Sequence, residues 1–107
     1  MQKPNKPFRT KNGFLINYTD WSRSFAIECA HDEGIILTHD HWLIINFLRE
    51  YFAKNMTTPA IRLLVQSLKK EYGAKKGNSL YLQSLFPTSP AVQAAKIAGL
   101  PKPKKCI

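Results

Sequence analysis

The chain has 107 residues, of which 44% are hydrophobic, and this fits one domain with a modest core. The longest apolar stretch is far shorter than a membrane-spanning helix, so we expect no membrane span. No apolar segment follows the basic N-terminus, so we expect no secretory signal and predict a cytoplasmic protein. The net charge is +9, and the whole excess lies after residue 50, where ten basic side chains accompany a single acid, Glu71.

This uneven charge favours an acidic protein or a nucleic acid as partner, and a merely solubilising surface is the plain alternative. Two cysteines, together with three histidines that have no zinc-binding spacing, predict no metal site. The basic residues surround no glycine-rich phosphate loop, and the chain is too short for a separate cofactor domain, so we expect no cofactor.

A β-hairpin is the first predicted element, over residues 8–16. Its turn would be Asn12-Gly13, a pair that favours the tight turn of two-residue hairpins, and apolar residues flank it on both sides. An isolated hairpin is only marginally stable, so we expect this one to pack against helices.

The first helix is predicted to start at Trp21, with Thr19 or Asp20 as its cap, and to stop at Gly34. A second helix follows over residues 39–54. Its apolar positions cover most of its circumference, which predicts that it is the central and most buried helix of the fold. Thr38 would cap this second helix.

Three further helices are predicted from their start and stop residues. Their starts are Thr58-Pro59, Asn78 and Ser89-Pro90, and their stops are Gly73, Pro87 and Gly99. Beyond them, two prolines and three lysines in residues 100–107 favour a solvated, extended backbone that reaches at most about 26 Å.

The sequence therefore predicts a single, mainly α domain over residues 1–107. It would comprise the hairpin (8–16), a small orthogonal bundle of about five helices (20–99) and a mobile C-terminal arm (100–107). The short connections also allow a helix-turn-helix arrangement around residues 39–72, which would suit a nucleic-acid-binding protein.

Cys106 is the most informative candidate for chemistry. Nothing near it in the sequence can bury it, and Lys102, Lys104 and Lys105 favour its thiolate form. A thiolate on a mobile arm is suited to enter a partner's pocket and exchange sulfur. The alternative is an incidental cysteine on a disordered end.

Cys29 shares a helical face with Trp21 and Phe25, so we predict a core residue, although a disulfide with Cys106 is arithmetically possible. His31, His39 and His41 are predicted to lie on a solvated helix start rather than to bind a metal. The neighbouring acids Asp32 and Glu33 do not face each other on a helix, so we assign them no acid–base role.

The C-terminal residues 96–107, Lys-Ile-Ala-Gly-Leu-Pro-Lys-Pro-Lys-Lys-Cys-Ile, resemble the signature arm of the DsrC/TusE family. Weaker agreement runs through Thr58-Pro59-Ala60-Ile61-Arg62 and Lys76-Gly77-Asn78-Ser79, so the resemblance covers nearly the whole chain. In that family, DsrC proteins carry a second arm cysteine eleven positions before the penultimate one. Ala95 stands at that position here, so the chain resembles the TusE branch, which keeps only the penultimate cysteine.

The resemblance implies a sulfur relay. Similar proteins accept a persulfide sulfur on the penultimate cysteine, here Cys106, from TusD in the TusBCD complex. They pass it to MnmA bound to tRNA, which makes 2-thiouridine at the wobble position. Two alternatives stay open, namely a DsrC-like subunit associated with dissimilatory sulfite reductase and a helix-turn-helix nucleic-acid-binding protein. The residues expected to bind partners are Arg62, Lys96, Lys102, Lys104 and Lys105.

Overall fold

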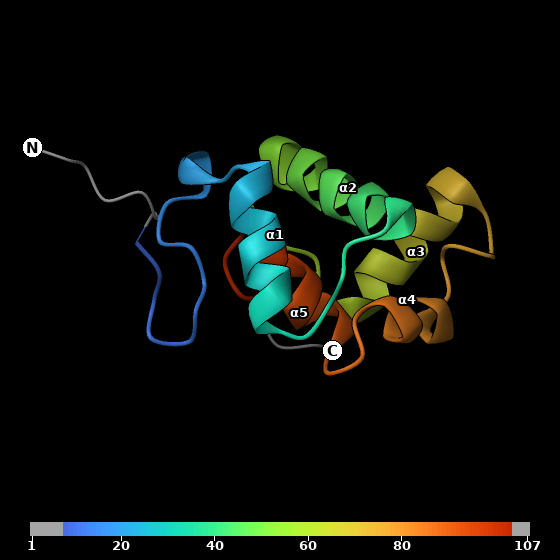
Figure 1. Ribbon diagram of the computed structural model, residues 1–107. Helices are drawn as coiled ribbons and strands as arrows, with labels where there is room; N and C mark the ends of the chain where they lie inside the picture. Colours follow the sequence, from blue (N-terminus) through green and yellow to red (C-terminus); the bar gives the residue numbers. More distant parts are fainter. Residues whose placement is uncertain (1–7, 104–107) are drawn as a thin grey trace, which may run out of the picture.

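The computed structural model describes residues 8–103. Within this range the chain is mainly helical, as predicted, with five α-helices, one short 3-10 helix and no β-strand (Figure 1). The elements in chain order are η1 (Tyr18–Asp20), α1 (Arg23–Asp32), α2 (His39–Asn55), α3 (Ile61–Tyr72), α4 (Ser79–Leu85) and α5 (Pro90–Ile97). No helix within residues 8–103 is both long enough and apolar enough to cross a membrane.

Local caps explain most helix starts. The backbone N–H of Thr38 donates to Nδ1 of His41 at 3.1 Å, which closes the first turn of α2 at the predicted position. The side chain of Asn78 accepts hydrogen bonds from the N–H groups of Leu80 and Tyr81, and this confirms the start of α4. Pro90 occupies the first turn of α5, again as predicted.

Two predicted starts are displaced. Thr19 and Asp20 belong to η1, and α1 begins later, with the Ser22 hydroxyl accepting from the N–H of Phe25. Helix α3 begins at Ile61 rather than directly after Thr58. The Thr58 side chain is buried instead of capping the helix, and its hydroxyl has no hydrogen-bond partner among residues 8–103.

The central helix is α5, not α2. Helix α5 packs against α1, α2, α3 and α4, and five of its eight residues are buried. In Figure 1 it lies behind α1, while α2 runs across the top of the molecule. Small side chains explain this position, because Ala91, Ala94 and Ala95 let neighbouring helices approach closely from several sides. On α2, by contrast, the large side chains of Trp42, Leu43 and Phe47 are only partly buried.

The predicted N-terminal hairpin is wrong. Residues 8–16 form a loop with a single antiparallel bridge between Arg9 and Leu15, and no strand extends from it within the described residues. The burial pattern explains the difference, since the adjacent residues Phe14 and Leu15 are both buried. A strand would direct consecutive side chains to opposite faces, so this pair fits a loop that covers the core.

The predicted boundary between bundle and arm also shifts. Leu100 was expected in the solvated arm, but its side chain is fully buried in the core, and its N–H donates to the carbonyl of Ala95 at 2.9 Å. Pro101 and Lys102 are exposed. The arm therefore leaves the folded body after Leu100.

Candidate functional site

The predicted sulfur-carrying residue Cys106 lies outside the described residues, and so do Lys104 and Lys105. Near this residue, the structure describes residues 97–103, the segment from which the arm departs. The site is therefore built from the end of α5 and from the side chains that hold it.

The backbone at the end of α5 turns sharply at Gly99. This residue has φ of +75°, a left-handed conformation that favours glycine. A Cβ at residue 99 would lie 2.6 Å from Cδ1 of Trp21 and 3.0 Å from Cδ2 of Leu15. Only glycine therefore satisfies both the backbone conformation and the close packing at this turn.

Two side chains distant in sequence complete the hydrogen bonding of the turn. Nε1 of Trp21 donates to the carbonyl of Ile97 at 3.0 Å, and Nη1 of Arg49 donates to the carbonyl of Ala98 at 2.9 Å. The final carbonyls of a helix lack partners within the helix, and buried ones must find them elsewhere. Trp21 and Arg49 thus fix the direction in which the chain leaves α5.

Arg49 is held by more than this bond. Its guanidinium stacks on the Trp21 ring at 4.3 Å and donates through Nη2 to the carbonyl of Tyr18 at 3.3 Å. Burial lowers the pKa of this guanidinium. Arg49 was not among the predicted site residues, although a cation within the apolar run of residues 42–52 is a signal of specific partners.

Lys96, a predicted partner-binding residue, is engaged within the chain. Its ammonium contacts Oε2 of Glu33 at 2.8 Å, and Nε2 of Gln93 donates to Oε1 of the same carboxylate at 3.0 Å. The hydrogen bond from Lys96 is the main cause that lowers the pKa of Glu33, and the bond from Gln93 acts in the same direction. Glu33 thus joins the end of α1 to α5, and Lys96 is not a free surface cation.

Two surface hollows lie beside the start of the arm and share Lys102. The loop-side hollow, of about 400 Å³, is lined by Phe14, Ile16, Pro101 and Lys102 together with Thr10, Asn12 and Leu15. The helix-side hollow, of about 360 Å³, is lined by Lys96, Lys102 and Glu33 together with Asn12, Phe14, Thr88, Ser89, Val92 and Gln93.

The predicted partner-binding residues are thus only partly brought together. Lys96 and Lys102 are six residues apart in the sequence, on either side of the end of α5, and both line the helix-side hollow. Arg62 is exposed on α3, and no described α3 residue lines either hollow.

Cys29 is a core residue, as predicted. Its side chain is fully buried, and burial raises the pKa of its thiol to about 11, although the nearby Arg9 and Lys96 act in the opposite direction. At neutral pH the residue is therefore a protonated, enclosed thiol. Since the thiolate is the reactive form, Cys29 is poorly suited to sulfur exchange.

The prediction of three solvated histidines is wrong for His41. Its ring is buried, with Nδ1 accepting from the Thr38 N–H and Nε2 donating to the carbonyl of Leu85 at 2.8 Å. It therefore joins the start of α2 to the end of α4. His31 and His39 are exposed, and residues 8–103 contain no group of three or more metal-ligating side chains.

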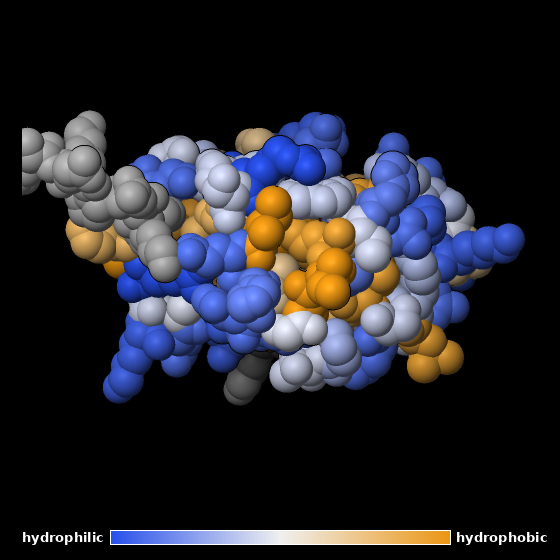
Figure 2. All heavy atoms as spheres, viewed as in Figure 1, coloured by the Kyte–Doolittle hydropathy of each residue, from blue (hydrophilic) through white to orange (hydrophobic). Residues whose placement is uncertain are grey.

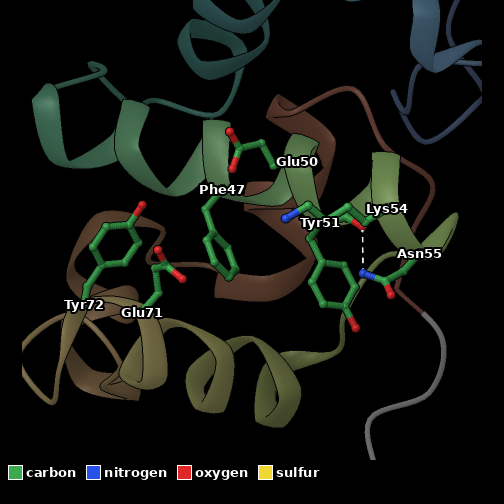
Figure 3. Close-up of a pocket in the computed structure, with 7 residues that line it drawn as sticks. All are labelled: Phe47, Glu50, Tyr51, Lys54, Asn55, Glu71 and Tyr72. Carbon is green, nitrogen blue, oxygen red and sulfur yellow. Dashed lines mark hydrogen bonds between the residues drawn. The ribbon is translucent and has the colours of Figure 1, made fainter.

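A further groove of about 150 Å³ lies between α2 and α3, and Figure 3 shows its walls. The Phe47 and Tyr72 rings meet edge to face at 6.2 Å, and the Asn55 amide donates to the Tyr51 carbonyl at 2.9 Å. Of the predicted site residues that the structure describes, none lines this groove, and Cys29 does not either.

An apolar surface patch lies elsewhere, over α1 and the connector into α2. Figure 2 shows it as the orange area in the middle of the view. Ile27 and Ile36 are exposed there, and Arg23 stacks over the neighbouring Trp42 ring at 4.0 Å. The associated hollow is lined by these four residues together with His31, Ile35 and Leu37, and none of the described arm residues 100–103 lines it.

Comparison with known proteins assigns the family. A family model described as "DsrC like protein" matches residues 4–107, almost the entire chain. The chain belongs to the DsrC-like family. Among relatives in this family, "Sulfurtransferase TusE" of Yersinia pseudotuberculosis is 54% identical over 95 residues, which cover 89% of this chain and 88% of that protein. "Sulfurtransferase TusE" of Buchnera aphidicola is 50% identical and covers 89% of this chain and 83% of its own length.

Solved DsrC-like structures share the fold. The NMR structure of Allochromatium vinosum DsrC superposes with a TM-score of 0.85 at 46% identity, covering 92% of this chain and 88% of that one. The crystal structure of the oxidized gamma-subunit of dissimilatory sulfite reductase from Archaeoglobus fulgidus gives 0.80 at 38% identity, covering 96% and 94%. The helical fold and the sulfurtransferase relatives together support a sulfurtransferase role for this chain.

Proposed function

We propose that this chain is a sulfur-relay protein that carries sulfur as a persulfide on Cys106. The donor would be a TusD-type cysteine in a TusBCD complex, and the acceptor would be MnmA bound to tRNA, which forms 2-thiouridine at the wobble position. The relatives named TusE support the relay role, and the resemblance described above suggests the donor and the acceptor.

The state of Cys29 is the observation that carries the assignment to Cys106. The chain contains two cysteines, and the one within the described fold is buried with a raised thiol pKa. Cys106 follows an exposed Lys102 and two further lysines in the sequence, and nearby cations favour a thiolate. Elimination and local charge therefore agree on the same residue.

The transfer itself is a displacement at sulfur. The Cys106 thiolate attacks the terminal sulfur of the donor's persulfide, R–S–SH. A new S–S bond forms on Cys106, the S–S bond of the donor breaks, and its electron pair leaves with the donor sulfur as a thiolate, R–S⁻. The chain then holds Cys106–S–SH, and the same displacement by an acceptor thiolate returns Cys106 to its starting state. No external oxidant or reductant enters either step.

Ala95 argues against a role that requires two arm cysteines. By the family resemblance, this is the position of the second arm cysteine in DsrC proteins. Ala95 is fully buried in α5, and its carbonyl accepts from the N–H of Leu100. Without a thiol at residue 95, the arm cannot close a disulfide between residues 95 and 106.

A reconstituted relay tests the proposed partners. Purified chain would be combined with cysteine desulfurase, cysteine, TusA, TusBCD, MnmA, ATP and tRNA, and 2-thiouridine would be measured in digested tRNA. We expect 2-thiouridine with the parental chain and with Cys29→Ala, and none above background with Cys106→Ser. Equal formation with Cys106→Ser would refute the role of Cys106. Formation independent of the chain would refute the proposed acceptor.

The nucleic-acid alternative predicts a different result. Exposed Arg62, Lys69 and Lys70 on α3 could contact phosphates without reading sequence. Salt-sensitive binding of DNA that is unchanged by Cys106→Ser, in a chain that accepts no sulfur, would favour that alternative.

A further inference from the structure

The loop of residues 8–16 exposes two large apolar side chains close together. Phe8 is 72% exposed and Ile16 is 64% exposed. The N–H of Ile16 donates to the carbonyl of Phe8 at 3.1 Å, so the two residues are neighbours across the loop. Adjacent exposed apolar side chains on a small domain indicate a contact surface more strongly than scattered single ones.

This loop is firmly attached to the folded body. Phe14 and Leu15 are buried, and the Arg9 guanidinium lies 4.7 Å from the centre of the Phe25 ring and 3.5 Å from the carboxylate of Asp32. The exposed side chains are therefore presented from a fixed backbone, which lowers the entropic cost of binding a partner.

The loop also lies directly beside the arm. Phe14, Leu15 and Ile16 form the loop-side hollow of about 400 Å³ together with Pro101 and Lys102, the first exposed residues after α5. The hollow thus joins the N-terminal loop to the start of the arm in one continuous surface. Lys102 on its edge and Lys11 in the loop make this surface basic.

We propose that this surface is the docking site for the protein that donates sulfur to Cys106. Here the arm-base surface means residues 8–16 with Pro101 and Lys102. The partner would place an apolar side chain into the loop-side hollow, against Ile16, and carboxylates opposite Lys11 and Lys102. This inference rests on the proposed function and adds the surface and the partner chemistry.

The reach of the arm supports this location. Cys106 is four residues beyond Lys102, and four extended residues span at most about 14 Å. A partner that encloses the sulfur of Cys106 in its own active site must bring the rim of that site to within this distance of Lys102. The arm-base surface is where such a rim meets the folded body.

The other apolar patch lacks this connection. Among the described arm residues 100–103, none lines the hollow beside Ile27 and Ile36, whereas Pro101 and Lys102 line the loop-side hollow. The short reach of the arm therefore favours the arm-base surface over the patch on α1 and the connector.

Matched substitutions test the proposal. Ile16→Asp would place a charge in the loop-side hollow, and Leu80→Asp is the control. Leu80 is 79% exposed on α4, and Figure 1 places α4 and the N-terminal loop at opposite ends of the molecule. A second pair of variants tests the role of charge and compares Lys11→Glu with Lys75→Glu, since both lysines are exposed. Folding is checked by thermal unfolding of all four variants.

The measurement is the rate of sulfur transfer from persulfide-loaded TusBCD to Cys106, followed by intact mass at several TusBCD concentrations. A small disulfide reagent, 5,5′-dithiobis(2-nitrobenzoic acid), reports the intrinsic reactivity of Cys106 in the same variants. We expect Ile16→Asp to lower kcat/KM by about tenfold or more, because a charge replaces an apolar side chain that the partner would bury. Lys11→Glu should lower kcat/KM several-fold and weaken its salt dependence. The controls and all reactions with the small reagent should stay within about twofold of the parent.

Three outcomes would overturn the proposal. The first is sulfur transfer to the folded Ile16→Asp variant at the same rate as to the parent. This outcome would refute the docking surface and leave the proposed function intact. The second is an equal loss in Leu80→Asp. The third is a parent that accepts no sulfur from TusBCD, which also refutes the proposed donor.

Discussion

Arg49 on α2 donates a hydrogen bond to the carbonyl of Ala98, the residue that follows α5, across 49 positions of sequence. The same guanidinium stacks on Trp21, whose indole N–H binds the neighbouring carbonyl of Ile97. The end of the central helix is thereby closed by side chains from two other parts of the fold. The folded body therefore fixes the direction in which the arm departs, and the end of α5 is not frayed.

Removing this contact should weaken the fold. Arg49→Met keeps much of the aliphatic packing but leaves the Ala98 carbonyl without its donor, and we expect a loss of about 1–3 kcal/mol in the free energy of unfolding. Arg49→Lys retains the charge and can make one of the two carbonyl contacts, so its loss should be smaller. Urea unfolding of both variants measures this. A Met variant as stable as the parent would show that the bond contributes nothing.

Gly99 and Gly34 form a matched pair for a test of close packing. Both have φ of +75°, but a Cβ at residue 99 would collide with Trp21, whereas nothing lies within 4 Å of one at residue 34. Gly34→Ala should cost only the backbone strain of about 1 kcal/mol, and Gly99→Ala should cost this strain and a further 1–3 kcal/mol or so. Equal thermal shifts in the two variants would contradict the packing at Gly99.

These two tests also show where sequence reasoning reaches its limit. Thr38, Asn78 and Pro90 mark helix starts because their effect is local, within three or four residues, and glycines mark the stops in the same way. The partners of the α5 end, Trp21 and Arg49, lie 76 and 49 residues from the carbonyls that they bind. No pattern of spacing or propensity predicts contacts at such separations.

The identity of the central helix and the conformation of residues 8–16 were predicted wrongly for a related reason. The apolar circumference of residues 39–54 suggested the central helix, but closeness of packing favours small residues, and the alanines of α5 occupy the centre instead. Asn12-Gly13 does lie in a turn, yet consecutive burial of Phe14 and Leu15 overrides the alternation that a strand needs. The arm motif with Cys106, by contrast, is a local sequence feature and needs no fold to be noticed.

The buried thiol of Cys29 predicts a specific loss of stability in alkali. Its pKa is raised to about 11 in the folded chain, so between about pH 9 and 11 the unfolded chain loses this proton first. Stability should therefore fall as pH rises through this window, by up to about 2–3 kcal/mol from this group. The difference in unfolding free energy between the parent and Cys29→Ala, measured at pH 7, 9 and 10.5, should shift in favour of the variant. A difference independent of pH would contradict the account.

The Glu33–Lys96 pair predicts a loss of stability in acid. Lys96 and Gln93 lower the pKa of Glu33, so the carboxylate stabilises the fold above its ordinary pKa, and this contribution is lost as pH falls through the lowered value. At pH 7, Glu33→Gln should cost about 1 kcal/mol, and the cost should shrink below pH 4. A double-mutant cycle with Lys96→Met checks the cause. If Glu33→Gln costs as much in the Lys96→Met background as in the parent, the pair is not the origin.

The most direct test of the central claim is the mass of the intact chain after exposure to persulfide-loaded TusBCD, with the modified cysteine located by peptide mapping. The account predicts a gain of one sulfur, about 32 Da, on Cys106 and none on Cys29, because the buried thiol of Cys29 stays protonated and the thiolate is the attacking form. Cys29→Ala should gain the same mass, and Cys106→Ser should gain none. Sulfur found on Cys29, or retained by Cys106→Ser, would contradict it.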